Sequence, residues 1–319
     1  MMSILFHILL NSIIPIFIML GLGLAVDKMF NLDINTLTKI SLYLIMPAFA
    51  FVSIYATDIS VDLFRVILLN AALVPVNFAL GAAVSKLLKL PGITRKAFEN
   101  SLMFCNSTNI GVSLLTLVFS NAPFISGGGT PYLELALSVQ VMAMLTQNIA
   151  INTIGFINNG GDDMTWKKGL GRVIRMPSPY AVLLAFLLKL VPYDFTATPV
   201  WPALQFLRNG LVSVALLTLG AQISKTRINF KDKAPYLASL CRLVGGPVAA
   251  FLLIRLFGFD GVIAQALLIL SATPSAVNVV MLAIENKGDV VFSVQTVTTS
   301  TLLSAVTMTT AVYLAYRLF

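Results

Sequence analysis

Long runs of apolar residues separated by short polar connections make up most of this 319-residue chain. A helix needs roughly 20 apolar residues to cross the hydrocarbon layer of a bilayer. Ten segments approach or exceed that length, and the connections between them are too short to form a separate soluble domain. The segments are residues 4–26, 35–56, 62–88, 97–119, 133–157, 176–192, 199–223, 234–257, 262–284 and 289–316. We therefore predict an all-α integral membrane protein with ten transmembrane helices.

Composition and charge support this class and give the chain an orientation. Only 11% of the residues are charged, whereas a soluble domain carries about 25%. Of the 21 Lys and Arg residues, 15 lie on or beside the connections that follow the odd-numbered segments. The positive-inside rule makes those connections cytoplasmic and places both termini outside a cell membrane. The distribution of the basic residues thus matches the orientation of the chain in the membrane. The net charge of +8 therefore does not indicate a nucleic-acid partner, and we expect none.

The sequence offers little for metal chemistry or catalysis. Two cysteines and one histidine cannot form an ordinary structural zinc site. An enzyme acting on lipid would need an acidic metal cluster, a histidine pair or a nucleophile with its base. The sequence contains none of these patterns, so we expect neither an enzyme nor a cofactor.

Matching features in the two halves suggest a duplication. They fall in the same order along both halves: Pro15 and Pro179, Pro75 and Pro247, and the Ser-Val-Gln triplets at 138–140 and 293–295. An odd number of helices per repeat turns the second copy upside down in the membrane. We therefore expect two inverted five-helix repeats, residues 1–160 and 170–319, with the loop at 158–175 as the seam.

Two of the ten segments contain poor helix formers at their centres. Residues 104–111 read Phe-Cys-Asn-Ser-Thr-Asn-Ile-Gly, and residues 271–278 read Ser-Ala-Thr-Pro-Ser-Ala-Val-Asn. Pro274 lacks a backbone donor and clashes with the preceding turn, and Asn, Ser and Thr compete for backbone hydrogen bonds. Unwound backbone at membrane depth is tolerated only inside protein or along a wet cavity. We predict that both helices break and that the breaks form the binding site.

A broken helix also offers a way to bind negative charge. Each second half-helix would begin in mid-membrane with free N–H groups, which carry partial positive charge and hold anions. Asn109 and Asn278 are the expected caps of these two half-helices. The alternative is that small polar residues here serve only the close packing of helices.

Other polar side chains are predicted at a similar depth. Arg242 and Arg208 lie inside helices, where a cation is costly and is a functional candidate by default. Arg242 could bind a substrate carboxylate or brace the broken helices, and Arg208 could extend to the outer surface. The glutamines are candidates for the site or for hydrogen bonds between helices. The candidate substrate-binding residues are Asn106, Ser107, Thr108, Asn109, Pro274, Ser275, Asn278, Arg242, Gln140, Gln147 and Gln295.

The ten-helix layout and the two central motifs, at 105–111 and 273–278, resemble the auxin efflux carrier family. This family includes bacterial malate and malonate permeases and plant PIN-type carriers. The resemblance implies a fold similar to NhaA and the bile-acid symporters, in which broken helices 4 and 9 cross. Helices 1, 2, 6 and 7 would form a scaffold, and helices 3–5 and 8–10 a transport domain that moves as an elevator.

The resemblance also implies roles for individual residues. Asn106, Asn109 and Asn278 would line the substrate site, and Pro274 would lie at the second break. The sequence departs from PIN-type carriers at Ser113, where those carriers usually have a proline. The geometry of the first break therefore has to come from the structure.

We expect secondary transport of a small organic anion, either a carboxylate such as malate or malonate or an auxin-like acid. The sequence lacks a nucleotide-binding loop, so ATP is not the expected energy source. The coupling ion is left open between H⁺ and Na⁺, and sodium-coupled symport of the bile-acid type is the alternative. Antiport of Na⁺ for H⁺ is disfavoured because the crossing lacks carboxylates. The lipid bilayer and a homodimer through the scaffold helices complete the expected partners.

Overall fold

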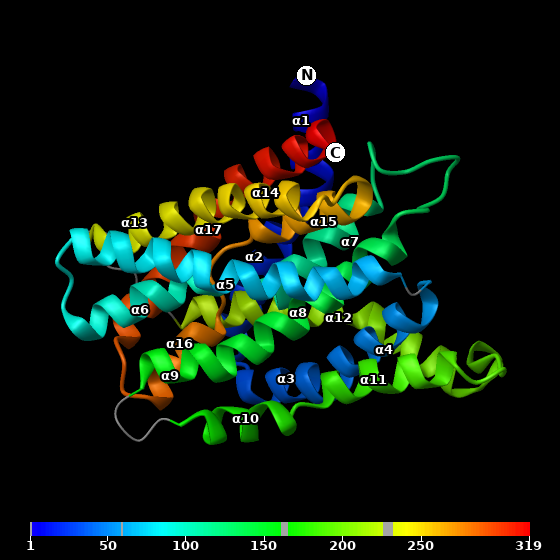
Figure 1. Ribbon diagram of the computed structural model, residues 1–319, viewed down its shortest axis with the longest axis horizontal. Helices are drawn as coiled ribbons and strands as arrows, with labels where there is room; N and C mark the ends of the chain where they lie inside the picture. Colours follow the sequence, from blue (N-terminus) through cyan, green and yellow to red (C-terminus); the bar gives the residue numbers. More distant parts are fainter. Residues whose placement is uncertain (1, 59, 161–164, 226–231) are drawn as a thin grey trace.

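The computed structural model describes residues 2–58, 60–160, 165–225 and 232–319 (Figure 1), and those residues are helical apart from connections and isolated backbone bridges. The first half contains α1 (Met2–Ile8), η1 (Leu9–Ile13), α2 (Ile14–Phe30), α3 (Ile34–Ile40), η2 (Ser41–Ile45), α4 (Met46–Ala56), α5 (Val61–Leu87), α6 (Gly92–Met103), η3 (Ser107–Gly111), α7 (Val112–Phe119), α8 (Leu133–Ala150), η4 (Ile151–Gly155) and α9 (Phe156–Asn159). The second half contains α10 (Trp166–Ile174), α11 (Pro177–Lys189), η5 (Phe195–Ala197), α12 (Val200–Ser224), α13 (Ala234–Leu240), η6 (Cys241–Gly245), α14 (Gly246–Phe257), α15 (Gly261–Ser271), α16 (Asn278–Glu285) and α17 (Val290–Leu318).

Within the described residues, seven continuous helices are long and apolar enough to cross a membrane. They are Ile4–Phe30, Ile34–Ala56, Val61–Leu87, Leu133–Asn159, Val200–Ser224, Ala234–Phe257 and Val290–Leu318. The pair α10 and α11, bent by 58° between them, makes an eighth if it is counted as one span. The all-α membrane class is thus confirmed. The count of ten stays a prediction, because the segments at 97–119 and 262–284 are each divided into two shorter helices.

The sequence predicted a loop at residues 158–175, between the two repeats. That prediction is wrong for the second part of the segment, which forms the helix α10. Trp166, Leu170 and Ile174 recur every four residues and share one exposed face of this helix. Basic residues occupy much of the remaining surface, so the helix is amphipathic and too short to span a membrane. The Gly161-Asp162-Asp163 part of the seam lies outside the described residues.

Wide π-helical turns mark the points where prolines enter the long helices. The turns η1, η2 and η6 each end two residues before a proline: Pro15, Pro47 and Pro247. Proline has no N–H to donate and its ring clashes with the carbonyl four residues earlier. A wider turn relieves that clash while the helix continues across the membrane.

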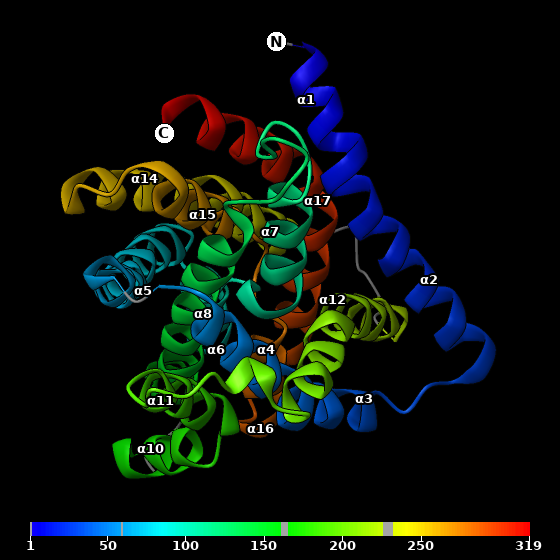
Figure 2. The ribbon, with the colours of Figure 1, turned by 90° about the vertical axis from the view of Figure 1, so that its right-hand side faces the viewer.

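The helices pack in two groups. In the first, α2 lies along α12, and α4 packs against α11 and α12. Glycines allow α2 and α12 to approach closely, since a Cβ at Gly23 would overlap the backbone of Leu217 and a Cβ at Gly220 that of Leu20. Figure 2 shows α2 beside α12 on one side of the molecule and α5 beside α14 on the opposite side.

The second group contains both interrupted segments. Here α5 packs on α6, α8 and α14, and α17 packs on α13, α15 and α6. The two groups meet where α4 contacts α8 and where α12 contacts η3 and α7. The first interrupted segment therefore lies at the boundary between the groups.

Candidate functional site

The two interrupted segments cross each other. The helix α6 ends at Met103, and α15 ends at Ser271. Between the half-helices, Cys105 and Ser275 form an isolated antiparallel bridge. The N–H of Asn106 donates to the carbonyl of Pro274 at 2.7 Å, and the N–H of Ala276 donates to the carbonyl of Phe104 at 2.9 Å. The prediction that both helices break is confirmed.

Neighbouring groups satisfy much of the unwound backbone. The N–H of Ser275 donates to the Ser300 hydroxyl at 3.2 Å, and the Ser275 hydroxyl donates to the carbonyl of Ser101 at 2.8 Å. Such bonds are required because an unpaired backbone group away from water is costly. Pro274 and Ser275 are thus buried and support the crossing. Neither residue lines the cavity that lies beside the crossing and is described below.

The expected caps are wrong. The side-chain oxygen of Asn106, and not that of Asn109, caps η3, because it accepts from the N–H of Asn109 at 3.2 Å. Asn278 is the first helical residue of α16, and Val277 before it makes no side-chain cap. Since it has no capping role, the exposed amide of Asn278 is free to face the cavity.

A cavity lies where the second half-helices begin. The broken helices contribute to its wall the first residues of both half-helices, namely Asn106, Ser107, Thr108, Asn109, Val277 and Asn278. Gln147 and Asn148 of α8 add further amides, and no charged side chain lines the cavity among the described residues. Most of its polar groups are thus uncharged amides and hydroxyls.

Four residues on the opposite wall come from helices that sequence analysis did not connect with the site. Thr38 and Ser41 lie on α3 and η2, and Thr218 and Gln222 lie on α12. Their spacing of three and four residues puts each pair on one helix face. A polar pair at helical spacing inside an apolar segment was therefore the signal that could have found them.

The cavity continues toward one end of the molecule. A second cavity shares Asn148 and Asn278 with the first and reaches Arg172 on α10 and Arg175 just after that helix. Near its far end, Arg172 forms an ion pair of 2.7 Å with Glu285, the last residue of α16. The route from the crossing thus leads to the basic helix α10.

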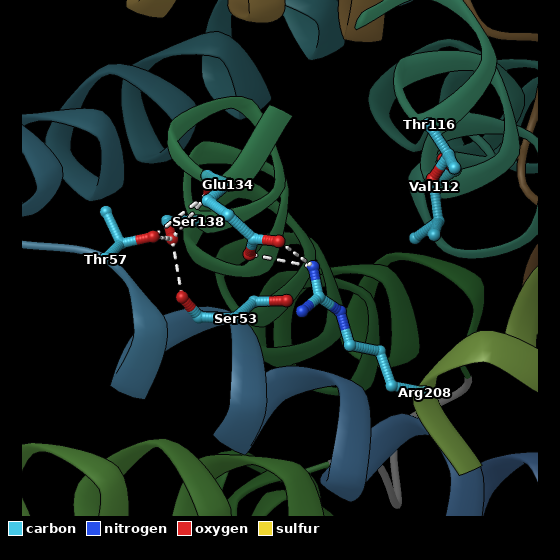
Figure 3. Close-up of polar contacts among 7 residues, drawn as sticks. All are labelled: Ser53, Thr57, Val112, Thr116, Glu134, Ser138 and Arg208. Atoms are coloured by element: carbon cyan, nitrogen blue, oxygen red, sulfur yellow. Dashed lines mark hydrogen bonds and ion pairs between the residues drawn. The ribbon is translucent and has the colours of Figure 1, made fainter. Parts of the chain in front are cut away.

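At the other end, ion pairing and hydrogen bonds join the two helix groups (Figure 3). One guanidinium nitrogen of Arg208 contacts both carboxylate oxygens of Glu134, at 2.7 and 2.8 Å. Beside this pair, the Ser138 hydroxyl donates to the Thr57 hydroxyl at 2.6 Å and contacts the carbonyl of Ser53 at 2.9 Å. Arg208 therefore binds a carboxylate instead of extending alone to the surface.

Arg242 lies at the crossing but does not line the main cavity. Its side chain is buried, and its three guanidinium nitrogens donate to the carbonyls of Leu102, Ser271 and Thr273. Of the two roles expected for Arg242, this geometry favours bracing of the broken helices over direct contact with a substrate.

The three candidate glutamines have different positions. Gln147 lines the main cavity and also a smaller one on the Arg242 side of the crossing. Gln140 donates to the carbonyl of Ser107 and so supports the first break from behind. Gln295 is buried in α17 and lines none of the cavities described above.

Comparison with known proteins supports a membrane transport protein. The family described as membrane transport protein matches residues 164–313, which include Arg242, the second break and α17 up to Tyr313. No curated protein matches the chain significantly. The family match agrees with the resemblance of the two central motifs, at 105–111 and 273–278. The match, which covers slightly less than half of the chain, supports a membrane transporter of the auxin efflux carrier type.

Proposed function

We propose that this membrane transporter is a secondary carrier of a small organic anion, which binds in the cavity at the crossing. The observation that carries the proposal is the meeting of two half-helix N-terminal ends at one cavity with an uncharged, amide-rich lining. Helix N-termini and amide N–H groups stabilise negative charge without a neighbouring cation. A carboxylate of the malate, malonate or auxin type fits this chemistry.

We also propose an elevator movement between the two packing groups. The scaffold would be α1 to α4 with α11 and α12, and the remaining spans would form the transport domain, with the two halves as inverted repeats. The packing of α2 on α12 and of α4 on α11 supports this division. The cavity supports it too, because Asn109 and Asn278 come from one group and Thr218 and Gln222 from the other.

The positions of the cavities support an assignment of the transport state. The route from the crossing leads to α10, whose basic residues mark the cytoplasmic side under the positive-inside rule. The Arg208–Glu134 pair joins the two groups at the opposite end. We propose that this is the inward-facing state of a carrier in the cell membrane.

Uptake into proteoliposomes tests the function. A labelled panel of dicarboxylates and indole acetate should show saturable uptake of at least one acid into vesicles that contain the protein. Asn109→Ala and Asn278→Ala should each lower that uptake by about tenfold or more, while Asn121→Ala, just beyond α7 and outside the cavity, should leave it unchanged. Wild-type uptake in both cavity variants would refute the site, and the absence of uptake of any organic anion would refute the function.

A further inference from the structure

The first half-helices end at the same crossing where the second half-helices begin. Carbonyl oxygens at a helix C-terminus have no donor within the helix and carry partial negative charge. Two oxygens of this kind, from Leu102 and Ser271, meet around a single point together with the carbonyl oxygen of Thr273, which lies two residues beyond the end of α15. Arg242 fills that point, with donor distances of 3.0 Å to Leu102, 2.5 Å to Ser271 and 3.4 Å to Thr273.

In carriers with broken helices, carbonyls of this kind coordinate the coupling cation, commonly Na⁺. We propose that the guanidinium of Arg242 is a resident cation of the crossing: it occupies the place of a coupling sodium ion, so that transport does not require Na⁺. The transport part of this inference rests on the proposed function, but the occupation of the carbonyls does not. It deepens that function by removing sodium-coupled symport as the alternative.

The surroundings of Arg242 hold the guanidinium in place. The residue is 2% exposed, and none of the ion pairs among the described residues includes it. One turn later, Gly246 leaves the space that the group needs, because a Cβ there would lie 2.9 Å from Cζ and from one terminal nitrogen. A buried charge is tolerated only when polar partners compensate it. Here backbone carbonyls provide that compensation, as they would for a bound metal cation.

The arrangement gives each broken helix a separate partner at each end of its break. The N-terminal ends of η3 and α16 face the cavity proposed for the anion, and the C-terminal ends of α6 and α15 face Arg242. With the C-terminal ends already bound to a cation, the crossing does not have to recruit one before the anion binds. Arg242 is therefore a positioning residue that holds the two breaks together in every step of the cycle.

Thermal unfolding of the purified protein tests the inference without any substrate. Wild type should have the same Tm in sodium chloride and in choline chloride of equal ionic strength, because Arg242 already occupies the carbonyls. Arg242→Ala should have a lower Tm, and both Na⁺ and low millimolar guanidinium should raise it. Equal concentrations of urea, which has a similar shape but no charge, should not raise it.

Arg255→Ala is the matched control, since Arg255 also donates to a backbone carbonyl, that of Leu318, but at an exposed position. Its Tm should not respond to guanidinium or to Na⁺. Should Arg242→Ala fail to fold, Gly246→Ala is used in its place. The added Cβ should displace the guanidinium and make the Tm rise in Na⁺ relative to choline.

Two results of the Tm experiment would overturn the inference: a higher Tm of wild type in Na⁺ than in choline, or a folded Arg242→Ala protein that neither cation stabilises. For any acid that wild type carries into vesicles, the uptake rate should be equal with and without Na⁺. A rate that increases severalfold with Na⁺ would also overturn it. A failure of the whole uptake panel would refute the proposed function and leave the Tm experiment unaffected.

Discussion

Asn278 and Ser275 are three residues apart and have opposite environments. Asn278 is exposed to the cavity, whereas Ser275 is fully buried, with its hydroxyl donating to the carbonyl of Ser101 and its N–H donating to the Ser300 hydroxyl. Both are small polar residues at the second break, Ser275 in its unwound backbone and Asn278 at the start of α16. Side-chain amides and hydroxyls in this region thus divide into groups that face the cavity and groups that hold the backbone.

This division predicts a different outcome for each substitution. Asn278→Ala should lower anion uptake by about tenfold or more, since a hydrogen bond to a charged group contributes about 1.5–3 kcal/mol. Its Tm should stay near that of wild type, because an exposed side chain has few contacts to lose. Uptake assays beside thermal unfolding separate these effects, and a variant with normal uptake and a lowered Tm would contradict this division.

Ser275→Ala should show the reverse pattern. The hydroxyl bond to the carbonyl of Ser101 is lost, and an unpaired buried carbonyl costs about 1–3 kcal/mol. We expect a lower Tm with a substrate KM close to that of wild type in the folded fraction. A changed KM with an unchanged Tm would mean that Ser275 contacts the substrate.

Sequence reasoning identified the types of residue near the crossing but not the directions in which their side chains point. Of the candidate residues, Asn106, Ser107, Thr108, Asn109, Asn278 and Gln147 line the cavity, whereas Pro274, Ser275, Arg242, Gln140 and Gln295 do not. Side-chain direction follows from the regular period of a helix or strand. In the unwound backbone at Pro274 and Ser275 that period is lost, so only the structure shows which way each side chain points. Arg242, Gln140 and Gln295 lie in helices, and only the packing of those helices shows which of their faces meets the cavity.

Two glycines on the same helix, α12, differ in whether they contact a neighbouring helix. On α12, Gly220 lies against the backbone of Leu20 and Leu24, whereas Gly210 has open space around it. Small residues at helix interfaces in membranes allow backbones to approach closely. The contact between α2 and α12 therefore depends on one of these two glycines and not on the other.

Gly220→Ala should destabilise the protein by about 1–3 kcal/mol, the usual cost of forcing extra atoms into a packed contact. Gly210→Ala should leave stability unchanged or raise it slightly, because alanine favours helix over glycine. Thermal unfolding in detergent compares the two variants directly. Equal Tm values would show that the close approach of α2 and α12 does not limit stability.

Sequence reasoning succeeded best for elements in which helix-breaking residues stand inside a long apolar run. Both interruptions were predicted because Pro274 and the Asn-rich stretch at 106–109 oppose helix formation within apolar runs. The helix α10 was missed because it has only nine residues and is polar on one face. A helix of that kind forms at a membrane boundary, which single-residue preferences do not indicate.

For the molecule as a whole, the Arg208–Glu134 pair connects α12 of the proposed scaffold with α8 of the proposed transport domain. The Arg208 side chain is 14% exposed and the Glu134 side chain 42%, so water screens the pair only partly. An elevator movement between the two groups would have to break this contact. The pair would then stabilise the state seen here relative to the outward-facing one.

A charge exchange tests this role. Arg208→Glu should place two carboxylates opposite each other, favour the outward-facing state and slow uptake severalfold. The double variant Arg208→Glu with Glu134→Arg should recover much of the wild-type rate, because the pair is formed again with reversed charges. The single variant Glu134→Arg is measured as well. If the uptake rate of the double variant is reduced by as much as the two single variants together would reduce it, the pair does not control the movement.

Labelling of Cys105 tests anion binding at the crossing most directly. This native cysteine lines the main cavity, and Cys241 can be removed as Cys241→Ser. In that background, a transported acid should slow the reaction of Cys105 with a maleimide, with half-protection near the KM for uptake. A labelling rate that is the same with and without saturating transported acid would contradict binding at this cavity.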